Sequence, residues 1–389
     1  MKVCFWSTSF QADTQALACF LAEEFGEDVS VVTPNAERYR AEPVNTILPF
    51  KGRLLDRDRS DLREILTLMA PDVVIVDNHL PSFRVAPRLF VLWHGYGWRV
   101  DDLSTMRREL NRRVGDCTEP NPCFRWQAFG ELDRQYRIEH SLFAPDNVVA
   151  LGSAYSDLLL PGSVMRQTFQ RPSVQEHYRI DLSRPTVLLG LTWHHGAALS
   201  HWGDDHDLLQ RLVVHLEKKE VNLLFRLHDR SRYEKKYLDR LARVSDASPH
   251  VELKFKSESP DSLVDFLVSD VLISNYSSLL NAFYYTERAT LHIDPRGPGQ
   301  DTYYRKLKFG RVWKWKSRDP RATWKFEPTD IGGLRVDTFE GLLDGIDQAL
   351  TAPDCCVSAS RSYVARHITQ CDGATRERMR NWLQAWLTS

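Results

Sequence analysis

Polar residues gather near position 275, between a short apolar strand and an apolar helix. The run Val271–Ile273 predicts a buried strand, and the apolar and aromatic run Leu279–Tyr285 predicts a helix. Between them lie Asn275, Ser277 and Ser278, whose side chains and free backbone N–H groups can bind phosphate oxygens. Serine and asparagine are also the preferred helix-capping residues, so an ordinary N-cap is the alternative. The pattern therefore indicates either a phosphate or diphosphate site or a plain cap.

Two further groups of polar residues follow predicted strands. His94 comes directly after the strand Leu89–Trp93, and its near-neutral pKa suits a general base. Arg226 and His228 close the strand Asn222–Leu227; two residues apart on an extended chain, they share a face, and both can donate to phosphate oxygens. The alternatives are a histidine satisfied by backbone groups and an exposed strand end. We expect an acid–base group in the first half of the chain and anion-binding groups in the second.

Other polar positions have less specific interpretations. Asp157 lies beyond the predicted strand Val148–Leu151, where it can orient a base or bind a hydroxyl group. The neighbouring His194-His195 indicate a metal only weakly, because adjacent residues on an extended chain face opposite ways. The segment Gly203–Asp207 has acidic residues and a histidine, but it favours a helix cap. We predict no metal site.

A basic segment in the first half predicts a surface for anionic partners. It contains two adjacent pairs of arginines, and the pairs lie about one turn apart on a predicted helix. There they can form a basic face for anionic lipid or a phosphate-rich acceptor. Acidic residues nearby make a solvated helix face the alternative. The arginines are Arg107, Arg108, Arg112 and Arg113, and the acidic neighbours are Asp101, Asp102, Glu109 and Asp116.

The elements that position these residues alternate between strands and helices. Continuous Val/Ile/Leu runs separated by helices are typical of a parallel sheet that is covered on both faces. In the first half we predict strands at Lys2–Trp6, Asp28–Val32, Asp72–Asp77, Leu89–Trp93 and Val148–Leu151, and helices at Thr14–Phe25 and Asp61–Met69. In the second half we predict strands at Thr186–Leu191, Asn222–Leu227, Val251–Lys254, Val271–Ile273 and Ala289–Ile293, with helices at Asp207–Lys219, Tyr233–Val244, Ser262–Ser269, Thr338–Leu350 and Arg361–Leu387.

The length of the chain and this repeated rhythm predict two domains. A chain of 389 residues is too long for one hydrophobic core. The stretch from Pro161 to Pro185 is rich in Pro, Ser, Arg and Gln and lacks sustained periodicity, so we assign 161–184 as the linker. We expect an α/β protein whose two doubly wound halves, 1–160 and 185–360, face each other across a cleft.

Composition and charge exclude several classes of protein. Lys and Arg number 51 against 52 Asp and Glu, so the global charge gives no sign of nucleic-acid binding. No apolar run approaches the ~20 residues that span a bilayer, and Met1–Trp6 continues into polar Ser7–Ser9, which favours a first strand over a signal peptide. The seven cysteines show no zinc spacing and predict reduced cytosolic thiols. We expect a cytoplasmic protein, with peripheral contact at the inner face of the membrane as a further expectation.

Taken in order, these segments resemble the CDP-glycerol glycerophosphotransferase family, which includes the teichoic acid primases and polymerases. The resemblance runs from about residue 90 to the C-terminus, and its short motifs are more specific together than singly. They are Trp93-His94-Gly95, Gly152-Ser153 with Asp157, Pro185-Thr186 through Thr192-Trp193, Arg226-Leu227-His228, Ser269-Asp270 through Tyr276-Ser277-Ser278, and Asp372-Gly373-Ala374 with Arg376.

The resemblance implies a GT-B type fold with an acceptor domain at 1–160, a nucleotide-donor domain at 185–360 and a C-terminal helix, 361–389, crossing back to the first domain. It implies inverting transfer of a polyol phosphate from a CDP-activated donor to a cell-envelope glycan or lipid-linked acceptor, without a cofactor. His94 would be the base, with Asp157 as a second catalytic candidate. The donor diphosphate and nucleotide would be held by Thr192, Arg226, His228, Asn275, Ser277 and Ser278.

Several residues depart from the family pattern and leave other functions open. Asn275 replaces an Asp, and His194 replaces an Arg, which removes a bidentate phosphate clamp that histidine cannot copy. Leu191 stands where a Pro is usual, and Ala154-Tyr155 replace Pro-Arg. The donor can therefore be another CDP-polyol, or a UDP- or CMP-linked sugar used by a GT-B glycosyltransferase. A third alternative is an inactive paralogue that binds a nucleotide or glycan.

Overall fold

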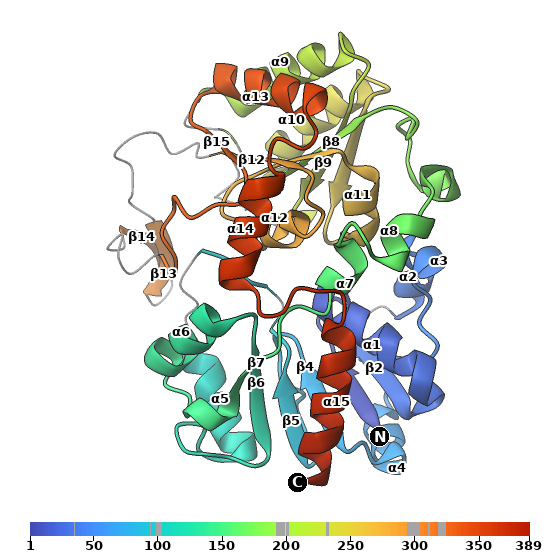
Figure 1. The fold of residues 1–389 in the computed structure, drawn as a ribbon, viewed down its shortest axis with the longest axis vertical. Helices are drawn as coiled ribbons and strands as arrows, with labels where there is room; N and C mark the ends of the chain where they lie inside the picture. The colour runs from blue at the N-terminus through green and yellow to red at the C-terminus, as the bar shows by residue number, and fades with distance from the viewer. Residues whose placement is uncertain are drawn as a thin grey trace.

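The computed structural model describes residues 1–34, 36–93, 95–98, 103–191, 199, 202–230, 233–293, 304–309, 312–317 and 324–389. Two parallel sheets lie one above the other, with helices around both (Figure 1). The first has the strand order β3-β2-β1-β4-β5-β6-β7, and every neighbouring pair is parallel. Its strands are β1 (Val3–Trp6), β2 (Val29–Thr33), β3 (Arg53–Asp56), β4 (Val73–Val76), β5 (Arg88–Val91), β6 (Phe124–Ala128) and β7 (Val148–Ala150).

The second sheet repeats this design with the order β10-β9-β8-β11-β12-β15, again parallel throughout. In both sheets the first strand of the half lies in the interior and the strand order reverses beside it, which is the doubly wound pattern. The strands are β8 (Thr186–Gly190), β9 (Asn222–Leu227), β10 (Val251–Phe255), β11 (Val271–Ser274), β12 (Ala289–Ile293) and β15 (Leu334–Val336).

Helices cover the faces of the sheets and connect the parallel strands. In the first half these are α1 (Ala12–Phe25), α2 (Ala36–Ala41), α3 (Val44–Ile47), α4 (Leu62–Met69), α5 (Ser104–Val114), α6 (Glu131–Ser141) and α7 (Ser156–Leu159). The remaining helices are α8 (Val164–Thr168), α9 (Asp205–Glu217), α10 (Lys235–Asp246), α11 (Leu263–Val268), α12 (Ser278–Tyr284), α13 (Phe339–Thr351), α14 (Val357–His367) and α15 (Thr375–Thr388). Short 3₁₀ turns lie at Gly26–Asp28, Pro145–Asn147 and Arg171–His177.

The sequence explains why the central strands form the core. Every residue of β1 and β4 is buried, and β-branched or aromatic side chains pack well in a sheet that is covered on both faces. One continuous cluster of buried apolar residues includes strands of the first sheet together with Leu188, Leu224 and Leu272 of the second. The two halves are therefore joined by a shared apolar region as well as by the chain.

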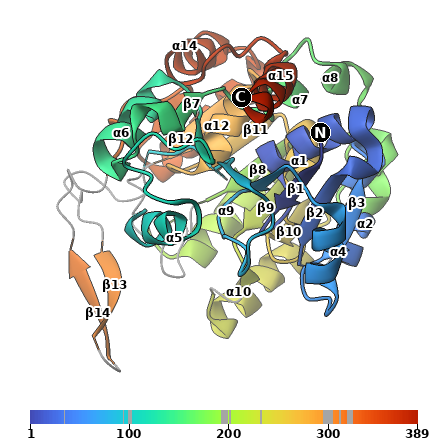
Figure 2. The ribbon, with the colours of Figure 1, turned by 90° about the horizontal axis from the view of Figure 1, so that it is seen from below.

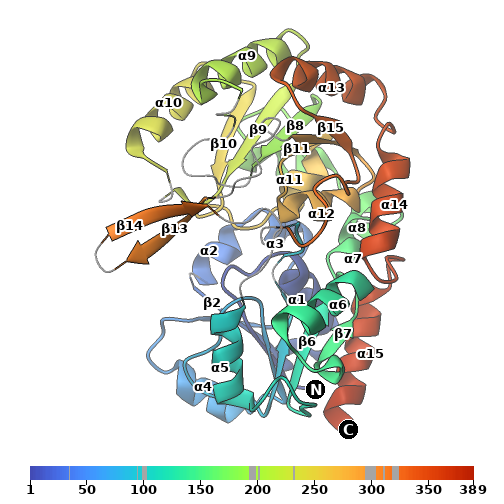
Figure 3. The ribbon, with the colours of Figure 1, turned by 90° about the vertical axis from the view of Figure 1, so that its left-hand side faces the viewer.

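The C-terminal helix returns to the first half, as Figures 1 and 3 show. Arg380 of α15 pairs with Glu24 of α1 at 2.7 Å, and the Trp382 ring lies 5.2 Å from the Phe90 ring of β5. Arg88 donates to the Trp386 carbonyl group. The α/β class, the two doubly wound halves facing across a cleft and the returning C-terminal helix are all confirmed.

The prediction of one continuous helix over Arg361–Leu387 was wrong. The chain leaves α14 at His367 and begins α15 at Thr375. Between them Gln370 and Gly373 have φ values of +47° and +86°, a backbone region that ends a helix. Apolar periodicity continues on both sides of this break, which is why the pattern suggested one helix.

Strands β3, β6 and β15 were not predicted, and neither was a separate two-stranded hairpin. In β6 the polar Arg125 and Gln127 interrupt the apolar run that marks the other strands. The hairpin consists of antiparallel β13 (Tyr304–Phe309) and β14 (Val312–Ser317), which extend away from the two sheets (Figure 2). Among the described helices, none combines the length and the apolar character that crossing a bilayer requires.

Candidate active site

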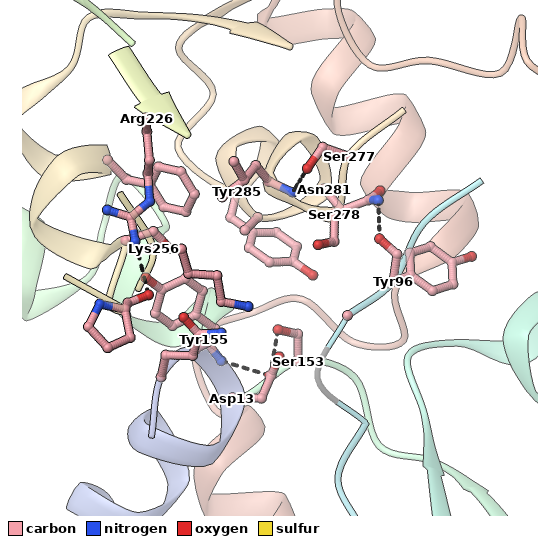
Figure 4. A pocket seen from close by; sticks show the side chains of 18 of the residues that line it. Asp13, Tyr96, Ser153, Tyr155, Arg226, Lys256, Ser277, Ser278, Asn281 and Tyr285 are labelled. Atoms are coloured by element: carbon pink, nitrogen blue, oxygen red, sulfur yellow. Dashed lines mark hydrogen bonds between the residues drawn. The ribbon is translucent and has the colours of Figure 1, made fainter. Parts of the chain in front are cut away.

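A cavity of about 310 Å³ lies between the two sheets, where the carboxyl ends of their strands face each other (Figure 4). Its first-half wall comes from the first turn of α1, which contributes Asp13, and from the loops after β5 and β7, which contribute Tyr96 and Ser153. Its second-half wall comes from the segments after β9, β10 and β11, which include His228 and Lys256. This is the edge at which doubly wound sheets bind ligands.

The serines predicted from the sequence lie in the second-half wall. Ser277 is the N-cap of α12 and accepts a hydrogen bond from the Leu279 amide, so the capping interpretation holds for it. Both Ser277 and Ser278 also line the cavity. Tyr276, just before them, has a φ of +32°, a strained value for a tyrosine that often marks a functional turn.

The loop after β5 packs directly against these serines. A Cβ atom placed on Gly95 would lie 3.2 Å from the Ser278 Cβ, so only glycine brings the backbone this close. The Tyr96 carbonyl group accepts a hydrogen bond from Asn281 of α12. The first-half loop and the helix that opens at Ser278 therefore form one continuous wall.

A buried chain of hydrogen bonds holds the same loop from behind. The Tyr96 hydroxyl group lies 2.7 Å from His367 Nδ1, and His367 Nε2 lies 2.6 Å from an Asp330 carboxylate oxygen. Burial lowers the pKa of His367. Trp98 adds a bond from its indole N–H to the Asp330 carbonyl group at 2.8 Å. The loop is thus fixed by α14 and by the segment before it.

Two basic side chains lie where this cavity meets a second one of about 410 Å³. His228 and Lys256 line both cavities. The His228 Nδ1 atom lies 2.8 Å from the Asp229 amide nitrogen, which fixes the ring locally. The second cavity continues toward Thr8 and Asp77, at the carboxyl ends of β1 and β4. Lys256 was missed because it follows β10 as a single lysine in a mixed polar segment.

Asp13 is the carboxylate of the first-half wall, and no motif in the sequence singles it out. It stands in the first turn of α1, where acidic residues are common. Its Oδ1 atom accepts hydrogen bonds from the Ser153 hydroxyl group at 2.7 Å and the Tyr155 amide at 3.1 Å. Burial raises the pKa of Asp13 to about 6.

Arg226, predicted from the sequence, lines the cavity, although it is 5% exposed and its guanidinium group is held by protein groups. Its guanidinium group pairs with Asp265 at 2.5 Å and donates to the Ser259 and Pro260 carbonyl groups. Pro260 also lines the cavity, so Arg226 holds part of the wall. Asn275 is buried at the end of β11 and is not among the described residues that line the cavity.

Asp157 is used within the fold. Its carboxylate accepts hydrogen bonds from the Thr375 amide at 3.1 Å and the Arg376 amide at 2.8 Å, at the N-terminus of α15. It is 4% exposed and is not among the described residues that line the cavity. This capping brings the segment that follows Gly152-Ser153 against the segment that follows Asp372-Gly373, although the two are distant in sequence.

Several predicted residues lie elsewhere. His94 and Thr192 lie outside the described residues, although Gly95 and Leu191, their chain neighbours, line the cavity. The four arginines are on α5, and none of them is among the described lining residues of either cavity. Arg107 is half-buried and donates to the Ser141 carbonyl group, whereas Arg108, Arg112 and Arg113 are exposed.

The acidic segment before α9 forms a helix cap, as predicted. Asp204 is the N-cap of α9 and accepts hydrogen bonds from the His206 amide at 3.0 Å and the Asp207 amide at 3.2 Å. Oxygen and nitrogen atoms of these three side chains lie within 4.8 Å of one another. Arg240 pairs with Asp204 at 2.5 Å and supplies the opposite charge.

Sequence comparisons give no relative, but solved structures match the whole chain. No family model and no curated protein matches the sequence. The wall teichoic acid polymerase TagF superposes with a TM-score of 0.69 at 11% identity, covering 100% of this chain and 89% of that chain. A UDP-N-acetylglucosamine 2-epimerase gives a TM-score of 0.55 at 13% identity, covering 100% of this chain and 97% of that chain.

A putative UDP-N-acetylglucosamine 2-epimerase from Listeria monocytogenes superposes similarly, with a TM-score of 0.54 at 14% identity, covering 99% of this chain and 96% of that chain. At these identities the likeness is one of fold. The fold is GT-B, with two Rossmann-like halves and a cavity between their carboxyl edges.

Proposed function

We propose that the protein transfers glycerol phosphate, or another polyol phosphate, from a CDP-activated donor to a cell-envelope glycan or lipid-linked acceptor. One observation carries the proposal: the second-half wall of the cavity presents the hydroxyl groups of Ser277 and Ser278 together with His228 and Lys256. Hydroxyl donors and cations around one cavity suit a diphosphate. The motif resemblance and the shared fold with a teichoic acid polymerase agree with this assignment.

The donor would lie with its diphosphate between Ser277, Ser278 and the segment after β9. His228 and Lys256 would neutralise the phosphoryl group that is transferred, because they line the boundary between the two cavities. Arg226 would act indirectly, because its hydrogen bonds to the Ser259 and Pro260 carbonyl groups hold that part of the cavity wall in place. In this assignment residues 185–360 bind the donor and residues 1–160 receive the acceptor.

The reaction follows from this placement. The acceptor oxygen forms a bond to the β-phosphorus while the bond from that phosphorus to the bridging oxygen breaks. CMP leaves with the electron pair, and the hydroxyl proton passes to His94, the residue before Gly95 in the cavity wall. A positioned base of this kind typically contributes about 10²–10⁴-fold.

A nucleotide sugar is the second candidate donor. The two structural neighbours named for UDP-N-acetylglucosamine share the fold, and Asn275 and His194 depart from the glycerophosphotransferase pattern. The same diphosphate-binding residues can serve both kinds of donor. The two candidate functions differ in the group that is transferred and in the nucleotide that is released.

A donor screen separates them. CDP-glycerol, CDP-ribitol and UDP-N-acetylglucosamine are offered in turn with glycerol 3-phosphate as acceptor, and released nucleotides are resolved by chromatography. Acceptor-dependent release of CMP supports polyol-phosphate transfer. Release of UDP alone assigns a glycosyltransferase, and release of neither nucleotide contradicts both.

We also propose a peripheral contact of α5 with an anionic membrane or a phosphate-rich acceptor. Arg108, Arg112 and Arg113 are exposed on this helix, outside both cavities. Attraction to an anionic leaflet is worth about 1 kcal/mol per charge near the surface and weakens with salt. Such a contact would bring a lipid-linked acceptor toward the first half of the fold.

A further inference from the structure

The chain reaches Asp13 through a strained turn. Phe10 and Ala12, which precede it, have φ values of +22° and +51°. For residues other than glycine such values are strained and persist where the surrounding structure imposes them. This turn leads from β1 into α1, whose first turn carries Asp13.

The two carboxylate oxygens of Asp13 have different surroundings. Oδ1 accepts both hydrogen bonds, from Ser153 and from the Tyr155 amide. The Ala154 amide also interacts with this carboxylate and lowers its pKa. Oδ2 accepts no hydrogen bond of normal geometry from the part of the chain that the structure describes, and it is not one of the fully buried polar atoms without a partner, so it is accessible. Asp13 is 8% exposed and is among the residues that line the cavity (Figure 4).

The opposite walls of the cavity differ in the chemistry they accept. The second half presents Lys256 and the serine hydroxyl groups, which suit phosphate oxygens. An ionised carboxylate repels a phosphate but accepts a hydrogen bond from an uncharged hydroxyl group, a charge-assisted bond of the stronger kind. Asp13 therefore favours the hydroxyl-bearing part of a substrate.

Burial and charge are consistent with an ionised Asp13 at neutral pH. Burial, and to a smaller extent the nearby Asp157, raise its pKa, while hydrogen bonds from Ser153 and from the Tyr155 and Ala154 amides lower it, leaving a value of about 6. At pH 7.5 the carboxylate is mostly charged. Oδ2 then acts as an acceptor only.

We infer that Asp13 is a substrate-binding residue that selects an acceptor with a second hydroxyl group beside the attacking one, as in a polyol or a sugar. This inference rests on the proposed function for the identity of the attacking hydroxyl group, and it adds a specificity-determining residue to that site. The second hydroxyl group donates to Asp13 Oδ2, which orients the attacking oxygen toward the donor phosphoryl group.

Two acceptor probes isolate this contact. Glycerol 3-phosphate and propane-1,3-diol monophosphate have the same charge and the same terminal hydroxyl group, and only the first has the neighbouring hydroxyl group. A hydrogen bond to a charged acceptor is worth about 1.5–3 kcal/mol. The wild-type protein should therefore prefer glycerol 3-phosphate by about 10–100-fold in kcat/KM.

The variant Asp13→Asn changes the cavity-facing atom and keeps the structural one. An asparagine Oδ1 still accepts from Ser153 and Tyr155, while its amide nitrogen replaces Oδ2 and can only donate. Glu23→Gln is the matched control, because it makes the same chemical change on an exposed position of the same helix. Thermal unfolding of both variants shows whether the fold is kept.

In Asp13→Asn the ratio of kcat/KM for the two probes should fall to within about threefold of unity, while the Kd of CDP stays within twofold of wild type. Glu23→Gln should behave as wild type in both measurements. Equal use of the two probes by the wild-type protein overturns the inference without any variant. So does an unchanged preference in Asp13→Asn.

Calorimetric binding of the two probes separates this inference from the proposed function. If no donor supports transfer but Asp13→Asn abolishes a tenfold binding preference for glycerol 3-phosphate, the proposed function fails and the role of Asp13 stands. If transfer occurs and the wild-type protein binds and uses both probes equally, the function stands and the role of Asp13 fails. Absence of transfer together with absence of binding of either probe overturns both.

Discussion

Lys256 should carry much of the donor affinity. Its side chain is half-buried and lines the same cavity as Ser277 and Ser278, on the side of Arg226 and Tyr155 (Figure 4). Two unit charges about 4 Å apart attract by about 4 kcal/mol at an effective dielectric constant of 20. Part of that is offset by lost hydration, and hydrogen bonds to charged groups have net values of about 1.5–3 kcal/mol. Replacing the ammonium group should raise the Kd of CDP by about 10–100-fold.

The variant is Lys256→Met, which keeps most of the aliphatic stem, and the assay is isothermal titration calorimetry with CDP at low and high salt. Lys236→Met on the exposed face of α10 makes the same change of charge away from both cavities. The loss for Lys256→Met should shrink at high salt, since screening weakens the wild-type contact. A Kd for CDP within twofold of wild type at low salt would refute the assignment of Lys256 to the diphosphate.

Four further predictions concern His228, His94, Asp157 and helix α5. His228→Ala should raise the donor Kd at least tenfold, about 1.4 kcal/mol, and an unchanged donor titration would remove His228 from the site. His94→Asn should lower kcat by about 10²–10⁴-fold with nearly intact donor affinity, and near-normal kcat would place the base elsewhere. Asp157→Ala should lower the free energy of unfolding by about 1–3 kcal/mol, because it removes the carboxylate that caps α15 and leaves buried amides unpaired; an unchanged melting temperature would contradict that role. In a sedimentation assay at low salt, more of the protein should bind to anionic liposomes than to neutral ones. Equal binding to both would contradict an electrostatic contact through α5.

Asp261 provides a prediction on stability and pH. Burial raises its pKa from 3.8 to about 7, so folding favours the protonated form and stability is lost as pH rises from about 4 to 7. Asp261→Asn removes this titration and should stabilise the protein by at least ~1 kcal/mol at pH 8, with a smaller gain at pH 5. Melting temperatures of wild type and variant across this range test it. A gain that does not grow with pH would show that Asp261 is not held as the neutral acid.

The sequence predicted the fold well where continuous apolar runs mark buried parallel strands. Strands β9 and β12 were predicted with their observed bounds, and β1, β4 and β11 within one residue. It failed where the signal is local and polar. Strand β6 contains Arg125 and Gln127, and the break between α14 and α15 depends on backbone conformations at Gln370 and Gly373 that periodicity does not report.

The site was predicted only in part, for a related reason. Residues in motifs at strand ends, such as His228 and Ser278, could be selected from chain order, and both line the cavity. Asp13 and Lys256 have no motif, and only the folded arrangement places them opposite each other. The partners of Arg226 and Asp157 lie far along the chain, so their structural contacts could not be read from local sequence.

The central claim is that a polyol phosphate moves from a cytidine nucleotide to an acceptor in the cavity between the two halves. The direct measurement follows a radioactive label from CDP-[¹⁴C]glycerol into glycerol 3-phosphate acceptor while CMP is quantified in the same reaction. The account predicts label in the acceptor product in equal amount to CMP, with both lost in Lys256→Met at subsaturating donor. CMP formed without labelled acceptor product, or UDP released from a nucleotide sugar while CDP-glycerol stays intact, would contradict it.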